Sequence, residues 1–283
     1  MAWDYRKPSW EGAMLRSIAP PRARLGGRRN SLTLILLPGS FMKTMLMYDK
    51  LIPVNRDQHR ALRIKASAHQ LSFARETNSL LLAVTELPLA ALDFPCVFVA
   101  TGDQHTMVAV VGLRDKDNLY IDAQGQWDTH SYLPAFIRRY PFVLAEQPGS
   151  SQLTVCVDEA FDGLNGTEGE ALFDAEGKDT PYLQQLQKFL LDFHNDMQRT
   201  TLFAKRLVEL DLLVERNIDF TLGEQRFNLN GFKVVDEDRL RKLDAAVVQE
   251  LFASGALGWI HAHLLSLNNV NKLGARLERR LAN

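Results

Sequence analysis

One stretch of the sequence gathers polar and aromatic side chains that could hold a ligand. Its members are Asp122, Trp127, Arg138, Arg139 and Tyr140. Two adjacent arginines beside aromatic rings suit an acidic or planar group, because a guanidinium stacks on rings and pairs with carboxylates. The same residues also fit a structural turn followed by the basic end of a helix, which the helix dipole favours. The sequence leaves both interpretations open.

The histidines show no spacing that favours a metal site. His194 and Asp196 lie two positions apart in a predicted helix, as do His261 and His263. Residues i and i+2 of a helix point about 200° apart, so one ion could not easily reach both. We therefore expect histidines of the core or the surface and predict neither a metal nor a cofactor. A metal site built from distant histidines, including His105 and His130, is the alternative.

His263 is nevertheless a candidate site residue. A closed pocket that joined it to Arg139, Asp122 and Trp127 would favour an enzyme. Exposed apolar surface on residues 181–213 would instead favour a protein that docks a partner.

The stretch 158–180 is acidic, rich in glycine and aperiodic, and it predicts an unusually long loop. Its carboxylates Asp158, Glu159 and Asp162 could offer oxygens to a hard cation, but they do not match the pattern of a calcium-binding loop. A solvated acidic loop is the favoured interpretation. The glycines of this stretch lack the lysine and hydroxyl of a phosphate-binding loop, and its carboxylates would repel a phosphate.

The two cysteines, Cys96 and Cys156, both fall in predicted strands. We expect two small buried apolar side chains. A catalytic thiol would need a partner histidine and an electropositive environment, which the sequence does not display. Two cysteines also exclude a disulfide scaffold.

Composition places these side chains in an ordinary globular protein. The chain has 283 residues, with 33 Lys and Arg against 34 Asp and Glu, and 46% of its residues are hydrophobic. A chain of this length can bury a sizeable core without staples. The net charge of −1 argues against a nucleic-acid-binding protein. No run approaches the roughly 18 apolar residues that a membrane span needs.

Residues 1–46 differ from the rest of the chain. Basic side chains outnumber acidic ones there, and Pro and Gly are frequent, so we expect a disordered basic extension. Its apolar run is shorter than a secretory signal needs. A basic arm for nucleic acid or anionic lipid is another option. An extension upstream of the real start is the favoured interpretation, because several methionines stand just before the first patterned segment.

Short strands joined by tight turns predict an antiparallel sheet. The predicted strands cover residues 96–99, 107–113, 118–122, 142–145 and 153–157. A hairpin turn is expected at 114–117, and a helix over 132–140. A second hairpin is predicted from 217–222 and 226–235, with Gly231 as a bulge.

Residues 181–213 carry the strongest helix signal. Thr180 is a cap residue, and Pro181 suits the first helical position. An unbroken helix of about 33 residues would be roughly 50 Å long. It would have to kink, bridge two lobes or pack against a partner helix.

The predicted fold class is therefore α+β: an antiparallel sheet of short strands packed with helices, with one long amphipathic helix (181–213) and a helical C-terminus. Residues 47–283 are expected to form a single domain, which could divide into two lobes near 158–180.

Several motifs occur in order along the chain and support one family likeness. They are YDKLIPVN at 48–55, FPCVF at 94–98, LYID at 119–122, LPAFIRRYPF at 133–142, VCVDEA at 155–160, LFD at 172–174, GFKVVD at 231–236 and HAHLLSL at 261–267. The most distinctive is the one at 133–142. Together they resemble the SapC family of bacterial proteins over about residues 47–275.

The resemblance implies a role but no catalytic residue, because the family has no established catalytic motif. Its name comes from a component associated with a bacterial surface layer and its transport. Similar proteins are encoded near outer-membrane receptors, flavin-dependent halogenase-like proteins and cupin-like oxygenase proteins. The favoured hypothesis is a cytoplasmic accessory or binding protein for surface-layer or cell-envelope functions. The alternative is an enzyme or enzyme partner that acts on a small molecule or peptide.

A protein partner is therefore expected, either an envelope or secretion component or an oxygenase- or halogenase-like enzyme. The long helix 181–213 could also join two copies of the chain. Neither a nucleic acid nor a membrane span is predicted.

Overall fold

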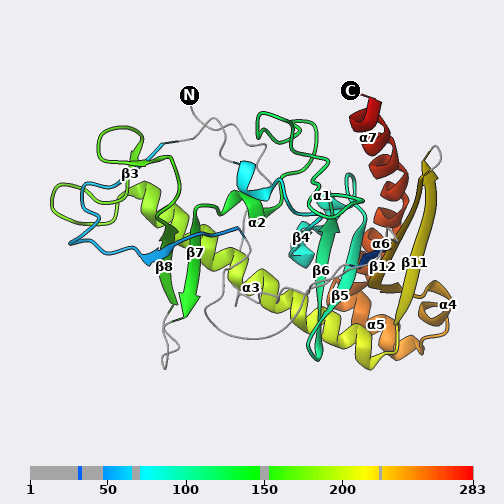
Figure 1. The fold of residues 1–283 in the computed structure, drawn as a ribbon. Helices are drawn as coiled ribbons and strands as arrows, with labels where there is room; N and C mark the ends of the chain where they lie inside the picture. Colours follow the sequence, from blue (N-terminus) through cyan, green and yellow to red (C-terminus); the bar gives the residue numbers. More distant parts are fainter. Residues whose placement is uncertain (1–30, 34–46, 66–70, 147–152, 223–224, 283) are drawn as a thin grey trace.

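The structure, a computed structural model, describes residues 31–33, 47–65, 71–146, 153–222 and 225–282. Their helices and strands form a mixed α+β fold with two main apolar cores, which one long helix joins (Figure 1). This arrangement confirms the predicted fold class.

The larger core packs on a six-stranded sheet. Its strands are β1 (Ser31–Thr33), β4 (Ser79–Leu81), β5 (Cys96–Thr101), β6 (Gln104–Val110), β11 (Leu213–Leu222) and β12 (Gln225–Val235). They lie in the order β1-β12-β5-β6-β4, and β11 also pairs with β12. The pair β1–β12 is parallel and the other pairs are antiparallel.

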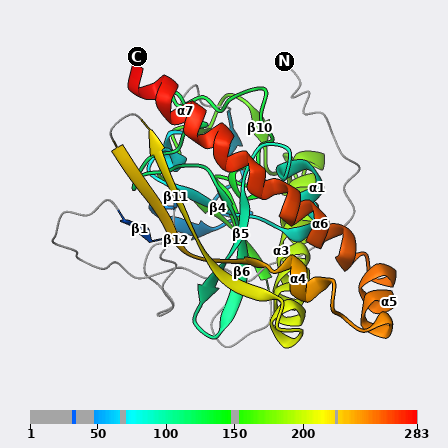
Figure 2. The same cartoon turned by 90° about the vertical axis from the view of Figure 1, so that its right-hand side faces the viewer.

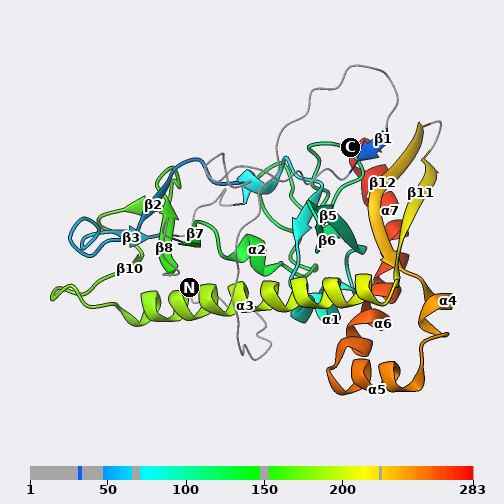
Figure 3. The same cartoon turned by 90° about the horizontal axis from the view of Figure 1, so that it is seen from below.

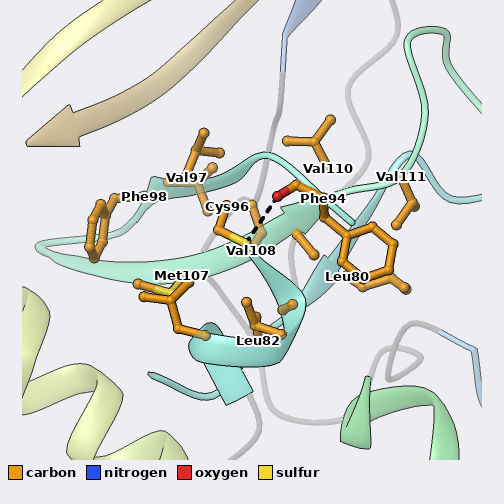
Figure 4. Close-up of a cluster of buried hydrophobic side chains, with 14 of the residues drawn as sticks. Leu80, Leu82, Phe94, Cys96, Val97, Phe98, Met107, Val108, Val110 and Val111 are labelled. Carbon is orange, nitrogen blue, oxygen red and sulfur yellow. Dashed lines mark hydrogen bonds between the residues drawn. The ribbon is translucent and has the colours of Figure 1, made fainter. Parts of the chain in front are cut away.

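The two central strands are buried because both of their faces are covered. β5 is buried from Cys96 to Val99, and β6 from Thr106 to Val110. Figure 4 shows Phe98 and Met107 among the apolar side chains that surround this pair. Each large apolar side chain buried in this way contributes about 1.5–3 kcal/mol to the free energy of unfolding.

The smaller core lies between two three-stranded antiparallel sheets and the start of the long helix. One sheet contains β2 (Leu51–Pro53), β7 (Phe142–Glu146) and β8 (Leu153–Asp158). The other contains β3 (Arg63–Ile64), β9 (Leu164–Asn165) and β10 (Glu170–Ala171). The stretch 158–180 is therefore not the long loop that we predicted. Two of its short segments pair with β3, which satisfies their backbone groups.

Helix α3 (Pro181–Glu209) runs along both cores, as Figure 3 shows from below. It begins as predicted, since the Thr180 side chain accepts a hydrogen bond from the Leu183 N–H. Leu183 and Leu190 pack in the smaller core, and residues from Phe193 to Leu207 pack in the larger one. The helix thus joins the two apolar cores. It stops earlier than predicted, at Glu209, because Asp211 has a φ of +52° and the chain turns into β11.

The other helices are short or lie at the C-terminus. They are η1 (Ser72–Ala74), η2 (Val84–Glu86), α1 (Leu87–Ala90), α2 (Ala135–Arg138), α4 (Glu237–Leu240), α5 (Ala245–Ala253), α6 (Ala256–Ser266), η3 (Leu267–Asn269) and α7 (Val270–Ala282). In Figure 2, α6 and α7 cross in front of the larger sheet, and α6 contacts β5 and β12. None of the helices in the described ranges is long and apolar enough to cross a membrane.

Some local predictions were wrong. Residues 118–122 form no strand, apart from a single bridge between Ile121 and Trp127. The chain does turn at 114–117, where Lys116 has a φ of +54° and the Leu119 N–H donates to the Val111 carbonyl at 2.8 Å, but no strand follows this turn. The hairpin between β5 and β6 turns at Gly102, with a φ of +60°. The helix predicted over 132–140 shrinks to α2, because prolines stand at both of its ends.

Two further predictions concern the bulge at Gly231 and the segment 1–46. The bulge at Gly231 is confirmed: the register of β11 and β12 shifts beside it, and its φ is +79°. Most of the segment 1–46 lies outside the described residues, so the expected disorder stays a prediction there. Within it, Ser31–Thr33 form β1 and pair with β12.

Candidate functional site

Asp122 holds a turn together at the surface. Its side chain is exposed, and its Oδ1 accepts hydrogen bonds of 2.9 Å from the main-chain N–H groups of Gln124 and Gln126. Both contacts serve the backbone of the turn itself. The structural-turn interpretation explains this residue.

Trp127 belongs to the larger core. Its ring stacks on Tyr120 with centroids 5.5 Å apart, and its indole N–H donates to the Ser131 carbonyl at 3.3 Å. The indole is 8% exposed. It thus acts as a packing group with a satisfied polar end.

His263 lies between β5 and β12, and its hydrogen bonds do not involve Arg138 or Arg139. Its two ring nitrogens face the Cys96 carbonyl and the Val235 N–H. Burial lowers the pKa of the imidazole to about 4. Asp122 and Trp127 thus lie in one turn, which the bridge between Ile121 and Trp127 closes. His263 instead contacts β5 and β12.

Arg138 belongs to a buried polar network around Glu86. Its Nε donates to the Leu133 carbonyl at 2.9 Å, and its Nη2 lies 3.7 Å from the Glu86 carboxylate. That carboxylate also accepts hydrogen bonds from the Tyr132 hydroxyl at 2.8 Å and from the Ala135 N–H at 2.7 Å. Glu86 thereby anchors the start of α2 to the turn η2, and Arg138 supports it.

Tyr140 packs against a separate small apolar cluster of Tyr48, Val143 and Cys156. Its ring stacks on Phe73 with centroids 3.9 Å apart. Its hydroxyl lies 3.4 Å from the Asp158 Oδ2, and burial together with this carboxylate raises the pKa of the phenol. Tyr140 therefore turns away from Arg138 and fixes the segment that leads into β7.

Arg139 is the unusual member of the predicted cluster. It follows α2 directly and is only 5% exposed. Three aromatic rings surround its guanidinium, with centroids 4.5 Å (Phe136), 5.2 Å (Phe193) and 5.7 Å (Tyr48) away. Its Nε has no hydrogen-bond partner. Burial lowers the pKa of the guanidinium, but an arginine stays charged in proteins.

His194 on α3 lies near this arginine, since the charge of Arg139 acts on its imidazole. The sequence predicts a core or surface histidine here and does not link it to Arg139. His194 is 3% exposed, and its Nδ1 also lacks a hydrogen-bond partner. Burial, and then the nearby charge of Arg139, lower the pKa of the imidazole to about 2. A signal did exist in the sequence, because His194 lies four positions after Leu190, on the buried face of the helix.

The carboxylates of Asp158, Glu159 and Asp162, which the sequence offers as metal ligands, do not point to one common site. The Asp158 carboxylate is buried and accepts hydrogen bonds from the N–H groups of Asp49 (3.0 Å) and Lys50 (2.9 Å). Glu159 is exposed and pairs with Lys50, while Asp162 is exposed. Within the part of the chain that the structure describes, no group of His, Cys, Asp and Glu side chains could hold a metal ion.

Both cysteines are buried and free, as the sequence predicted. Burial raises the pKa of the Cys96 thiol to about 12 and also raises that of Cys156. Neither thiol is activated as a nucleophile.

Comparisons with known proteins identify one similarity. The model of the SapC family matches residues 54–273, which is well over half of the chain. Neither a curated protein nor a solved structure matches the chain.

Proposed function

The chain belongs to the SapC family, and from this premise we propose that it is a non-catalytic accessory protein. It binds a protein partner that serves a bacterial surface layer or cell envelope, and it does so on the cytoplasmic side.

The observation that carries this proposal is the outer face of α3. Leu191 and Leu202 are 41% and 65% exposed on a helix that packs on both cores. They stand about three helical turns apart and therefore share one face. Exposed apolar side chains on a rigid helix are typical of surfaces that receive another protein. The segment from Phe193 to Leu207 holds the helix in place, so docking would cost little conformational entropy.

The titrating groups also favour binding over chemistry. General acid–base catalysis works best when the pKa lies near the operating pH. The pKa values of Cys96 (about 12), His263 (about 4) and His194 (about 2) all lie far from neutrality. At pH 7 these thiol and imidazole groups are uncharged.

One observation favours the alternative, an enzyme or enzyme partner linked to oxygenase- or halogenase-like systems. Burial raises the pKa of Asp196 on α3 to about 6. A carboxyl group with such a pKa can act as a general acid near neutral pH.

The test is to purify the protein from its native host without chelator and to determine its metal content and bound components by mass analysis. We expect a metal-free protein with one envelope or secretion component in stoichiometric amount. The double variant L191S/L202S should lose that component. The control L92S/L265S, which changes leucines 63% and 68% exposed on other elements, should retain it.

Three results would contradict the proposal. They are a stoichiometric metal ion, an oxygenase-like enzyme as the retained component, and an equal loss of the component from both double variants. The first two would support the alternative function.

A further inference from the structure

Among the described residues, two buried polar atoms without hydrogen-bond partners belong to Arg139, after α2, and to His194, on α3. Arg139 is 5% exposed and His194 is 3% exposed, and in the described part of the chain neither Arg139 Nε nor His194 Nδ1 makes a hydrogen bond. Buried polar atoms in native proteins are nearly always paired, so an exception indicates a function, an ion or a water. The two side chains are near each other, because the Arg139 guanidinium lies 5.2 Å from the ring of Phe193, which precedes His194 on α3, and its charge lowers the pKa of His194.

The rings around Arg139 do not satisfy the guanidinium fully. Tyr48, Phe136 and Phe193 attract its positive charge through their faces. A ring face accepts no ordinary hydrogen bond from the Nε–H in the guanidinium plane. None of the ion pairs found among the described residues includes Arg139. A buried arginine without a carboxylate partner is costly for the folded protein.

His194 adds a second donor beside this charge. Its imidazole is neutral, so one of its ring nitrogens carries a proton. When that nitrogen is Nδ1, both unpartnered atoms are N–H donors. Two N–H donors and a single positive charge are the complement of an acceptor that carries a single negative charge.

We propose that Arg139 and His194 form a binding subsite for a monoanion, namely the carboxylate group of a small organic ligand. One carboxylate oxygen accepts from Arg139 Nε–H and the other from His194 Nδ1–H. The rings of Tyr48, Phe136 and Phe193 line the place where the apolar carbon next to the carboxylate lies. A dianion such as sulfate is disfavoured, because one of its charges would stay buried without compensation.

This subsite is independent of the docking surface on α3. Leu191 and Leu202 are exposed, whereas His194 lies on the buried face of the same helix. A failure of one proposal therefore leaves the other unaffected.

The first experiment uses the unmodified protein and acetate as the probe. Acetate, acetamide, chloride and sulfate are titrated at constant ionic strength, and Tm is followed together with the ¹⁵N shift of His194 Nδ1. We expect a saturable rise of Tm and a shift of Nδ1 with acetate, and neither with acetamide or sulfate. A response to chloride but not to acetate would assign the subsite to a halide and overturn the carboxylate. An absence of any response would overturn the subsite.

The second experiment separates binding from packing. The variant Arg139→Met removes the charge and keeps the volume, and we expect acetate to bind roughly tenfold or more weakly. Without acetate its Tm should stay equal or rise, because an uncompensated buried charge is removed. The control Arg199→Met removes an exposed arginine from α3, the helix that carries His194, and should leave acetate binding unchanged. A large loss of Tm in Arg139→Met without acetate, together with acetate binding as tight as in the unmodified protein, would show that Arg139 has a purely structural role.

Discussion

His263 and Val235 form a hydrogen bond where two strands would otherwise pair directly. Lys233 on β12 stands opposite Phe98 on β5, so in this antiparallel register Val235 would face Cys96. Instead, the Val235 N–H donates to His263 Nε2 at 3.1 Å, and His263 Nδ1 lies 2.8 Å from the Cys96 carbonyl. The imidazole thus occupies the position of a backbone hydrogen bond. This geometry requires the neutral tautomer with the proton on Nδ1.

Replacement of this imidazole should destabilise the fold. His263→Ala leaves one buried N–H and one buried carbonyl unpaired and opens a cavity, so we expect a loss of about 3–5 kcal/mol in the free energy of unfolding. Urea denaturation measures it. His261→Ala, on the exposed side of α6, should change stability by less than about 0.5 kcal/mol. Equal effects of the two substitutions would refute the bridging role.

The same histidine should make stability depend on pH. Its pKa in the folded protein is about 4, below the 6.5 of a free imidazole, so the unfolded chain binds the proton first. The stabilisation is therefore complete above pH 6.5 and is lost as the pH falls towards 4. A difference of this size corresponds to about 3 kcal/mol.

A comparison of two proteins isolates this contribution. Between pH 7 and pH 4 the unmodified protein should lose about 3 kcal/mol more than His263→Gln, which does not titrate there. Asp196 acts in the opposite direction, because its pKa of about 6 is raised above the usual 3.8. Its effect is common to both proteins and cancels. Parallel pH profiles would contradict the assignment of the titrating group to His263.

Asp158 should act as a structural anchor rather than a metal ligand. Asp158→Ala leaves the partly buried N–H groups of Asp49 and Lys50 without their acceptor, so we expect a loss of about 2–4 kcal/mol in the free energy of unfolding, measured by urea denaturation. Glu159→Ala removes an exposed ion pair and should cost at most about 1 kcal/mol. Calcium or magnesium should leave Tm unchanged. A rise of Tm with either ion that Asp158→Ala abolishes would restore the metal hypothesis.

The thiol of Cys96 should react only when the protein unfolds. Its side chain is fully buried and its pKa is about 12, so at pH 8 it is neither accessible nor ionised. Labelling with an aromatic disulfide reagent should follow the rate of unfolding in urea. A cysteine introduced at the exposed position Ser72 serves as the fast-reacting control. Rapid labelling of Cys96 in the native protein would reveal an accessible thiol.

Features that depend on neighbours in the chain were predictable. The start of α3 follows from Thr180 and Pro181, because a cap acts on N–H groups within three residues. The bulge follows from Gly231, since a positive φ costs a glycine little. The attachment of α2 was not predictable, because it depends on how Glu86 holds the Ala135 N–H from a distant segment.

The candidate site also has features that the sequence predicted and features that only the tertiary structure decided. Composition and motif pattern determined the α+β class, the long helix and the family, since each is written in residue types and their spacing. They also marked Arg138 and Arg139 as a pair. Only the tertiary structure decided that Arg138 joins Glu86, whereas Arg139 is enclosed by rings and lies near His194. Burial and charge compensation depend on segments far apart in the sequence, and packing alone brings these together.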